Sequence, residues 1–143
     1  MKIRSSYGIL GNDAGIRAFQ YQHNFANANG AVFGSGTAGL QPGVYPNTNI
    51  TWEKSKNFNV GFDLGLLKNR LTLEFDYFKR HTYDILRSRI RTIPGTFGAQ
   101  LPDENYAVID TKGFEATLGY SHNIGKIELY ARANLGYANN KVI

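Results

Sequence analysis

The chain has 143 residues, a formal net charge of +5 and no cysteine. The lack of cysteine excludes a disulfide framework and any thiolate nucleophile or metal ligand. The basic residues are scattered among predicted strands and loops, so we predict no nucleic-acid partner. No apolar run approaches the roughly 18 residues of a membrane helix. A helical span is thereby excluded, but a β-barrel is not, because alternating strands average out in a hydropathy window.

The first predicted strand covers residues 2–10, with Ile3, Tyr7 and Ile9 on one face. Residues 11–51 are rich in Asn, Gly, Ala and Thr and contain Pro42 and Pro46. Proline cannot donate a hydrogen bond to a sheet, so this segment is predicted to be one long loop.

The strongest strand pattern lies between Trp52 and Leu86. Apolar and polar residues alternate through residues 52–67 and again through 71–87, with a tight turn at residues 68–70. Period-two alternation indicates a sheet with one apolar and one polar face. A strand from Glu53 to Leu67 would extend roughly 50 Å at about 3.3 Å per residue, far more than soluble strands usually reach.

A second long loop is predicted over residues 88–111, which include Pro94 and Pro102. Two further alternating strands follow at residues 112–122 and 127–137, joined by a tight turn at residues 123–126. Gly125 can supply the positive φ that such a turn requires. Asn139 is predicted to begin another polar loop.

The connections therefore alternate between long and short, as in outer-membrane barrels with short periplasmic turns and long extracellular loops. We predict an all-β fold: an antiparallel up-and-down meander of about five long strands that forms a segment of a large transmembrane barrel. Such barrels contain at least 8 strands, so this interpretation requires a fragment of something larger. A soluble antiparallel sandwich, its apolar face covered by a second sheet, remains the alternative.

Several motifs, in the same order along the chain, resemble those of the SusC/RagA family of TonB-linked outer-membrane proteins. Residues 46–55 read PNTNITWEKS, which is similar to the family's PNPNITWEKS. The other matching segments are KIRSSYG at 2–8 with GN at 11–12, NVGFD at 59–63, NRL at 69–71, DYFKR at 76–80, TYDIL at 82–86 and TKGFE at 111–115.

The resemblance implies a barrel of about 22 strands around an N-terminal plug. It implies uptake of glycans or peptides driven by TonB through the plug, a SusD-like lipoprotein lid and no cofactor. It places the chain in the C-terminal half of the barrel wall, in the outer membrane of a Gram-negative bacterium of the Bacteroidetes type. A soluble β-sheet carbohydrate-binding module is the rival function.

Aromatic residues divide into two sets of candidates. Those near strand ends are predicted to anchor the wall at the membrane interface, where Trp and Tyr gather: Trp52, Tyr77, Tyr120 and Tyr137. Those in the predicted external loops are candidate ligand contacts, with loop packing as the alternative: Phe33, Tyr45, Phe97 and Tyr106.

Charged residues of the opposite strand parity are predicted to face the lumen. They are Asp63, Glu74, Asp76, Glu115, Glu128 and Arg132. A catalytic carboxylate pair would need two of them around one reacting bond. We interpret them instead as a hydrated, salt-bridged lumen wall or as a surface that holds the plug. A row on the lipid-facing parity could pair with lipopolysaccharide phosphates, with plain solvation as the alternative: Lys79, Arg87, Arg89 and Arg91.

No enzyme is predicted. His23, His81 and His122 have no metal-ligand spacing, and no serine lies in a G-x-S-x-G turn. The glycines match neither a P-loop nor a dinucleotide fingerprint.

Overall fold

The computed structural model describes residues 1–33, 35–88, 94, 96, 98 and 100–143. Two compact units divide the chain, and each is described by itself. Unit 1 comprises Met1–Gly11, Lys54–Tyr83 and Val108–Ile143, and unit 2 comprises Asn12–Glu53 and Asp84–Ala107. Among the described residues, no helix is long and apolar enough to cross a membrane.

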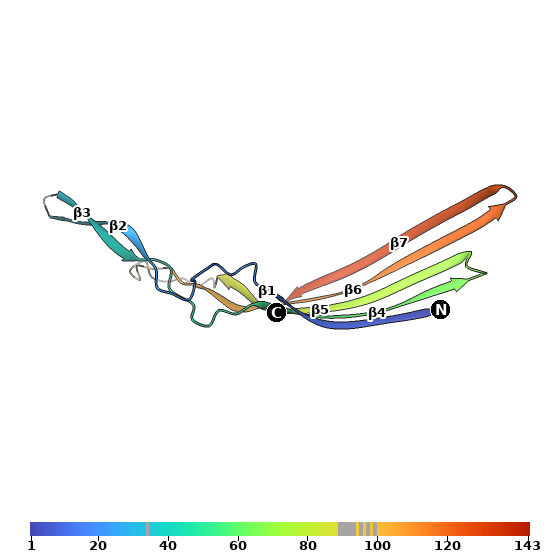
Figure 1. The fold of residues 1–143 in the computed structure, drawn as a ribbon, viewed down its shortest axis with the longest axis horizontal. Coiled ribbons are helices and arrows are strands. Elements are labelled where there is room, and N and C mark those ends of the chain that lie inside the picture. Colours follow the sequence, from blue (N-terminus) through green and yellow to red (C-terminus); the bar gives the residue numbers. More distant parts are fainter. Residues whose placement is uncertain (34, 89–93, 95, 97, 99) are drawn as a thin grey trace. The chain divides into compact units, whose positions relative to one another are not determined.

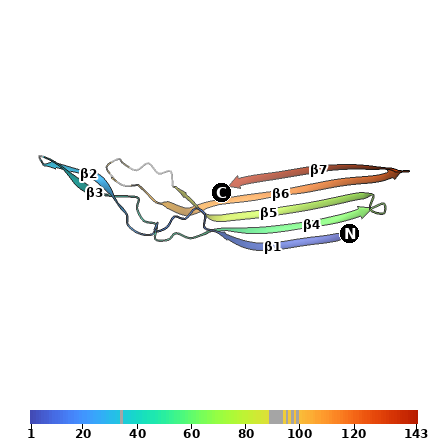
Figure 2. The same ribbon diagram turned by 45° about the horizontal axis from the view of Figure 1, so that its top comes forward.

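Five long strands form one sheet in the order β1-β4-β5-β6-β7, and neighbouring strands run in opposite directions (Figures 1 and 2). Their bounds are β1 Lys2–Asn12, β4 Glu53–Leu66, β5 Leu71–Ser88, β6 Asp103–Ile124 and β7 Ile127–Val142. A separate hairpin pairs β2, Phe25–Phe33, with β3, Ser35–Pro42. This architecture confirms the predicted all-β meander of five long strands.

The pairing register assigns each side chain to a face. Strands β4 and β5 pair without interruption from Lys54↔Tyr83 to Leu66↔Leu71, and β6 and β7 pair from Ile109↔Val142 to Ile124↔Ile127. Even-numbered residues of β4 and β6 therefore share a face with odd-numbered residues of β5 and β7. The alternation read in the sequence thus becomes one apolar and one polar face across the sheet.

Two short turns connect the strand pairs, as the sequence predicts. Leu67, Lys68 and Asn69 all adopt positive φ, at 54°, 58° and 68°. The second turn follows Ile124, and Gly125 supplies its positive φ of 63°. Glycine adopts this conformation at no steric cost.

The predicted long loops are partly wrong. The segment 11–51 contains the β2–β3 hairpin, in which Pro42 pairs with Phe25 at the open end. A proline at a strand terminus removes no interior ladder bond. Composition therefore misled the prediction.

Strands β6 and β7 extend well beyond their predicted ends, and β1 continues two residues further, to Asn12. Strand β6 begins at Asp103, inside the predicted 88–111 loop, and β7 continues to Val142. Asn139 pairs with Lys112 and Asn140 with Thr111. Backbone pairing continues there because a polar residue on an exposed sheet costs the ladder nothing.

The sheet of unit 1 is a single layer whose apolar side chains stay open. Ile85, in unit 2, is the one apolar side chain classed as buried in the described part of the chain. On the apolar face of unit 1, Phe58 is 42% exposed and Leu129 is 50% exposed. A soluble sandwich would cover such a face with a second sheet.

One glycine is required by close packing on the polar face. A Cβ at Gly113 would overlap the Tyr137 carbonyl oxygen and would lie 2.6 Å from Cζ of Phe78. The Phe78 ring thus occupies space that any side chain at position 113 would need. Gly8, in β1, differs because the space that a Cβ would occupy there is open, with no other atom within 4 Å.

Replacing Gly113 with Val is expected to lower the free energy of unfolding by about 1–3 kcal/mol, because the new methyl groups meet backbone that cannot move aside. Gly8→Val is the matched control and should be neutral or slightly stabilising. The measurement is the urea midpoint of the intact protein in detergent, followed by circular dichroism. Equal midpoints for the two variants would contradict the packing.

Candidate functional site

An aromatic row crosses four strands on the apolar face of unit 1. Ring centroids lie 5.5 Å apart between Phe62 and Phe75, 6.0 Å between Phe75 and Phe114, and 5.9 Å between Phe114 and Tyr137. These separations fall in the range of favourable ring pairs. The row joins β4, β5, β6 and β7 through side chains as well as through backbone.

The height of the apolar face fits a bilayer. On β6, the residues of this face run from Phe114 to Ile124. That is about 33 Å of strand at about 3.3 Å per residue, or about 25 Å along the membrane normal at the tilt typical of barrel strands. About 25 Å is also the height of the outward apolar band of outer-membrane barrels.

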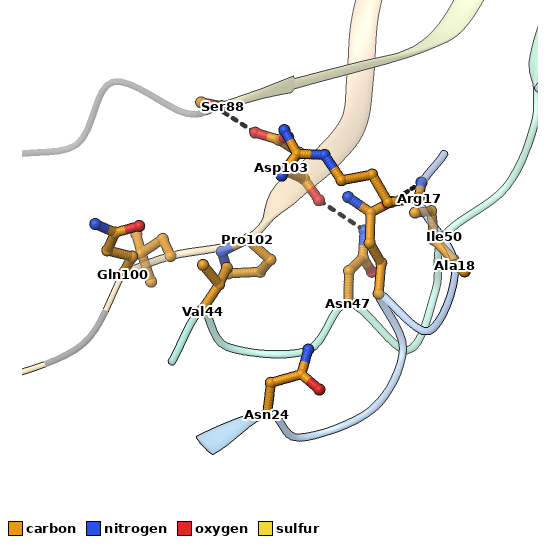
Figure 3. A pocket seen from close by; sticks show the side chains of 12 residues that line it. Arg17, Ala18, Asn24, Val44, Asn47, Ile50, Ser88, Gln100, Pro102 and Asp103 are labelled. Carbon is orange, nitrogen blue, oxygen red and sulfur yellow. Dashed lines mark hydrogen bonds between the residues drawn. The ribbon is translucent and has the colours of Figure 1, made fainter. Parts of the chain in front are cut away.

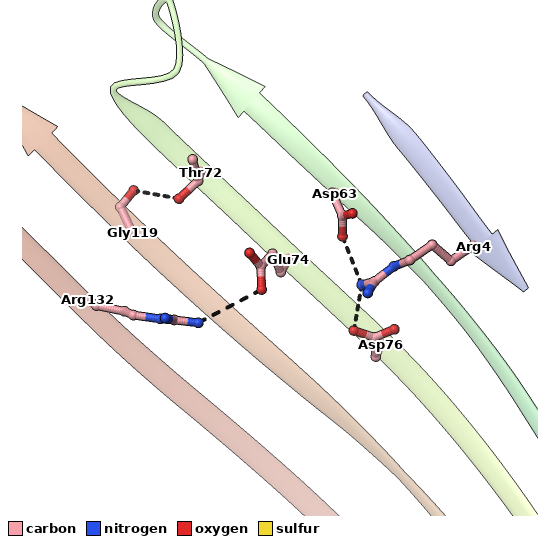
Figure 4. Close-up of polar contacts among 7 residues, drawn as sticks. All are labelled: Arg4, Asp63, Thr72, Glu74, Asp76, Gly119 and Arg132. Atoms are coloured by element: carbon pink, nitrogen blue, oxygen red, sulfur yellow. Dashed lines mark hydrogen bonds and ion pairs between the residues drawn. The ribbon is translucent and has the colours of Figure 1, made fainter.

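The opposite face carries ion pairs (Figure 4). The Arg4 guanidinium lies 2.8 Å from carboxylate oxygens of both Asp63 and Asp76, and it therefore links β1, β4 and β5. Arg132 Nη2 of β7 lies 3.9 Å from Glu74 Oε2 of β5. These contacts match the predicted salt-bridged wall, and Asp63, Glu74, Asp76 and Arg132 all take part in it.

Solvation of this polar face limits what it can do chemically. The side chains of Arg4 and Asp76 are both 42% exposed, so water screens their charges. Among the described residues, no group of three or more His, Asp or Glu is placed to hold a metal ion. The face is suited to lining an aqueous space.

A cavity of about 350 Å³ lies within unit 2 (Figure 3). Val44 and Gln100 form a parallel bridge beside it, and the Tyr45 amide donates to the Gln100 carbonyl at 2.9 Å. The Asn47 side-chain amide donates to the Asp103 carbonyl at 2.8 Å. These contacts bring segments that are distant in the sequence together around one cavity.

The lining of this cavity is mainly polar. Asp103 accepts a hydrogen bond from the Ser88 hydroxyl. The described lining residues are Arg17, Ala18, Gln20, Asn24, Val44, Asn47, Ile50, Ser88, Gln100, Leu101, Pro102 and Asp103. Amides and both signs of charge are available there, and none of these described residues is aromatic.

The PNTNITWEKS segment has a structural explanation. Asn47 forms a local turn by accepting the Asn49 amide at 2.9 Å. Thr51, four residues after Asn47, pairs with the Asn105 side chain as it would with a neighbouring strand. Asn105 accepts from the Thr51 amide at 3.0 Å and donates to the Thr51 carbonyl at 2.8 Å. Asn105 also donates to the carbonyl of Asp84 at 2.7 Å, where φ is +58°. One side chain thus joins three segments of unit 2.

Of the predicted ligand contacts whose side chains the structure describes, neither Tyr45 nor Tyr106 lines this cavity. Tyr45 lines a smaller hollow of about 130 Å³, where its ring meets His23 edge-on at 6.3 Å. The Tyr106 hydroxyl donates to the Ser88 carbonyl at 3.4 Å. Phe33 ends β2 with its side chain outside the described part, and Phe97 lies outside the described residues. A binding role for these four aromatics stays a prediction.

Sequence reasoning missed the polar lining. The cavity's charges come from Arg17 and Asp103 and its side-chain amides from Gln20, Asn24, Asn47 and Gln100, yet only Asn47 falls in a recognisable motif. Their meeting depends on hydrogen bonds across distant positions, which no local spacing reveals.

The predicted interface anchors occupy different places. Tyr77 pairs with Val60 on the apolar face, and Tyr137 ends the aromatic row. Tyr120 lies nearer the short turn and stacks on His122 with centroids 6.3 Å apart. Trp52 directly precedes β4, in unit 2, and is 60% exposed. Anchoring by all four stays a prediction.

Comparison with known proteins accounts for this geometry. Residues 7–142 match the family model described as TonB dependent receptor-like, beta-barrel. The chain is 30% identical over 140 residues to TonB-dependent receptor P3 of Formosa agariphila and 33% identical over 72 residues to TonB-dependent receptor SusC of Bacteroides thetaiotaomicron. These alignments cover 98% and 50% of this chain but only 14% and 7% of the relatives.

A solved structure leads to the same conclusion. A chain in the RagAB peptide importer, in its open-open state, superposes on 98% of this chain with a TM-score of 0.79 and 27% identity, and the match covers 15% of that chain. The fold and the two-faced sheet define a segment of a transmembrane-type β-barrel. The chain belongs to the family of TonB-dependent receptor-like β-barrels.

Replacing Arg4 with Gln is expected to lower the free energy of unfolding by less than about 1 kcal/mol, because the pairs are partly exposed. The loss should shrink at high salt and in an Asp63→Asn, Asp76→Asn background, where no carboxylate is left unpaired. Urea midpoints of the four combinations at low and high salt measure it. An unchanged loss in the double-Asn background would contradict the bridging role.

Replacing Asn105 with Asp is expected to destabilise the protein by about 1–3 kcal/mol, although the side chains have the same shape. An oxygen would then face the carbonyls of Thr51 and Asp84 in place of the amide donor. Asn134→Asp, on the exposed polar face of β7, adds the same charge and serves as the control. Hydrogen exchange of the Thr51 amide reports the local effect, and equal protection in both variants would refute it.

Proposed function

We propose that this chain forms wall and external loops of a SusC-like, TonB-dependent importer in the outer membrane of a Bacteroidetes-type bacterium. The observation that carries the proposal is the single-layer sheet with an aromatic row on one face and ion pairs on the other. Lipid would cover the first face and an aqueous lumen the second. An importer is a passive conduit at this wall, and no catalytic step is assigned to it.

Orientation follows from the connections. The turns after β4 and β6 are short and would face the periplasm, whereas the long connections, which fall in unit 2, would face outward. The loop cavity would then be available to cargo or to a SusD-like lipoprotein lid. Relatives named SusC and RagAB support such a partner, and energy would arrive from TonB through the receptor's plug.

We propose oligopeptides as the cargo, in preference to glycans. The described cavity lining offers Arg17, Asp103 and several side-chain amides, which suit a peptide's termini and backbone. Sugar sites usually place aromatic faces under the ring, and the described lining has none. The similarity to the RagAB peptide importer points the same way.

The soluble carbohydrate-binding module is the less favoured function. Its apolar sheet face would need a protein cover, and Phe58 and Leu129 are open. Family membership also favours a receptor.

Cell fractionation tests the location. The intact protein should sediment with outer membranes, resist carbonate extraction and require detergent for solubility. Recovery as a monodisperse protein without detergent would overturn the importer and favour the module.

Binding tests the cargo. The Arg17→Gln, Asp103→Asn variant of the intact receptor is expected to bind a tryptic digest of casein about tenfold more weakly than wild type, because charge-assisted contacts are lost. Lys126→Gln, Glu128→Gln removes the same charges beside a short turn and serves as the control. Equal binding by the two variants, or preferential binding of maltoheptaose by wild type, would contradict the peptide assignment.

A further inference from the structure

The apolar face of unit 1 ends in lysines, all at the end opposite the short turns. We call this set the basic rim. Its members, placed by the strand register, are Lys54 and Lys56 on β4, Lys79 on β5, Lys112 on β6 and Lys141 on β7.

Carboxylates are scarce on this face in the described part of unit 1. In the described part of unit 1, Asp110 is the one carboxylate on this face, and it contacts Nδ1 of His81. The polar face differs, because there carboxylates and arginines alternate and pair. The excess of positive charge therefore belongs to the lipid-facing side.

Three lysines of the rim surround a hollow. Lys79, Lys112 and Lys141 line a space of about 210 Å³ together with Asn139 and Asp110. No carboxylate in the described residues lies within ion-pair distance of these three ammonium groups. The Lys56 ammonium does not line this hollow and lies instead over the Tyr83 ring, 5.1 Å from its centroid.

The hollow directly adjoins the aromatic row. On the shared face, Lys112 is the next residue after Phe114, and Asn139 is the next after Tyr137. A ligand here would place its anionic group among ammonium groups and its apolar part against aromatic rings. That combination describes an amphiphile, and a free anion would leave the ring surface uncovered.

We propose that the basic rim binds the phosphates of a phosphorylated glycolipid in the outer leaflet. Lysine is a compact point charge that suits a phosphate, and three around one hollow match a multiply charged headgroup. The proposal rests on the proposed function, which puts this end of the sheet at the outer surface of the membrane. It shares only Lys79 with the row suggested by sequence, which stays a prediction: Arg87 belongs to unit 2, and Arg89 and Arg91 lie outside the described residues.

The test compares two triple variants of the full-length receptor purified in detergent from outer membranes. Lys79→Gln, Lys112→Gln, Lys141→Gln removes the hollow's charges, and Lys2→Gln, Lys68→Gln, Lys126→Gln removes the same charge from the polar face and the short turns. Mass spectrometry measures co-purified phosphorylated glycolipid per receptor. The rim variant should lose at least about tenfold, and the control should match wild type.

Further arms separate the possible outcomes. The variant Lys79→Arg, Lys112→Arg, Lys141→Arg keeps the three positive charges and should fold and keep its lipid. Loss of lipid can thereby be told apart from misfolding. Delipidated receptor should regain binding from vesicles containing lipid A but not from vesicles of phosphatidylethanolamine alone, and about 10-fold excess inorganic phosphate should not compete.

Equal lipid in the rim variant and wild type, or full competition by inorganic phosphate, would overturn this proposal. Neither result would affect the importer assignment, which the fractionation and detergent experiments test separately.

Discussion

A sheet one strand thick is stable only if each of its faces meets a medium that suits it. In unit 1, backbone pairing runs through β4 and β5 over their full shared length, and side chains divide strictly between the faces. Phe62, Phe75, Phe114 and Tyr137 form one surface, and Arg4, Asp63 and Asp76 tie the other together. Hydrocarbon on one side and water on the other would satisfy both, and the proposed function depends on that separation.

The same separation governs where glycine and charge are placed. Because residue 113 is a glycine, the Phe78 side chain can lie against the backbone at that position on the polar face. The aromatic ring then covers backbone that water would otherwise reach. Arg4 holds two carboxylates of neighbouring strands, which would repel each other without it. Lysines instead collect on the apolar face, at one end. The proposed phosphorylated glycolipid would supply the opposite charge there.

Outside the β2–β3 hairpin, side-chain hydrogen bonds supplement backbone pairing in the irregular segments of unit 2. Asn47 and Asn105 each satisfy backbone groups of other segments, and Asn105 serves both the amide and the carbonyl of Thr51. Backbone groups shielded from water need partners, and here side chains serve those that backbone–backbone bonds, such as that from Tyr45 to Gln100, leave over. The PNTNITWEKS stretch therefore has a structural role, and the same side-chain hydrogen bonds help to form the cavity beside it.

The sequence by itself determined the five long strands, their faces, the short turns and the family, because period-two alternation and motif order are local properties. It also placed Asp63, Glu74, Asp76 and Arg132 together on the polar face. Only the tertiary structure decided that β2 and β3 pair, that β7 continues through Asn139, and that Arg17 and Asp103 line one cavity. Those features depend on register and on hydrogen bonds between residues far apart in the chain, which local composition does not reveal.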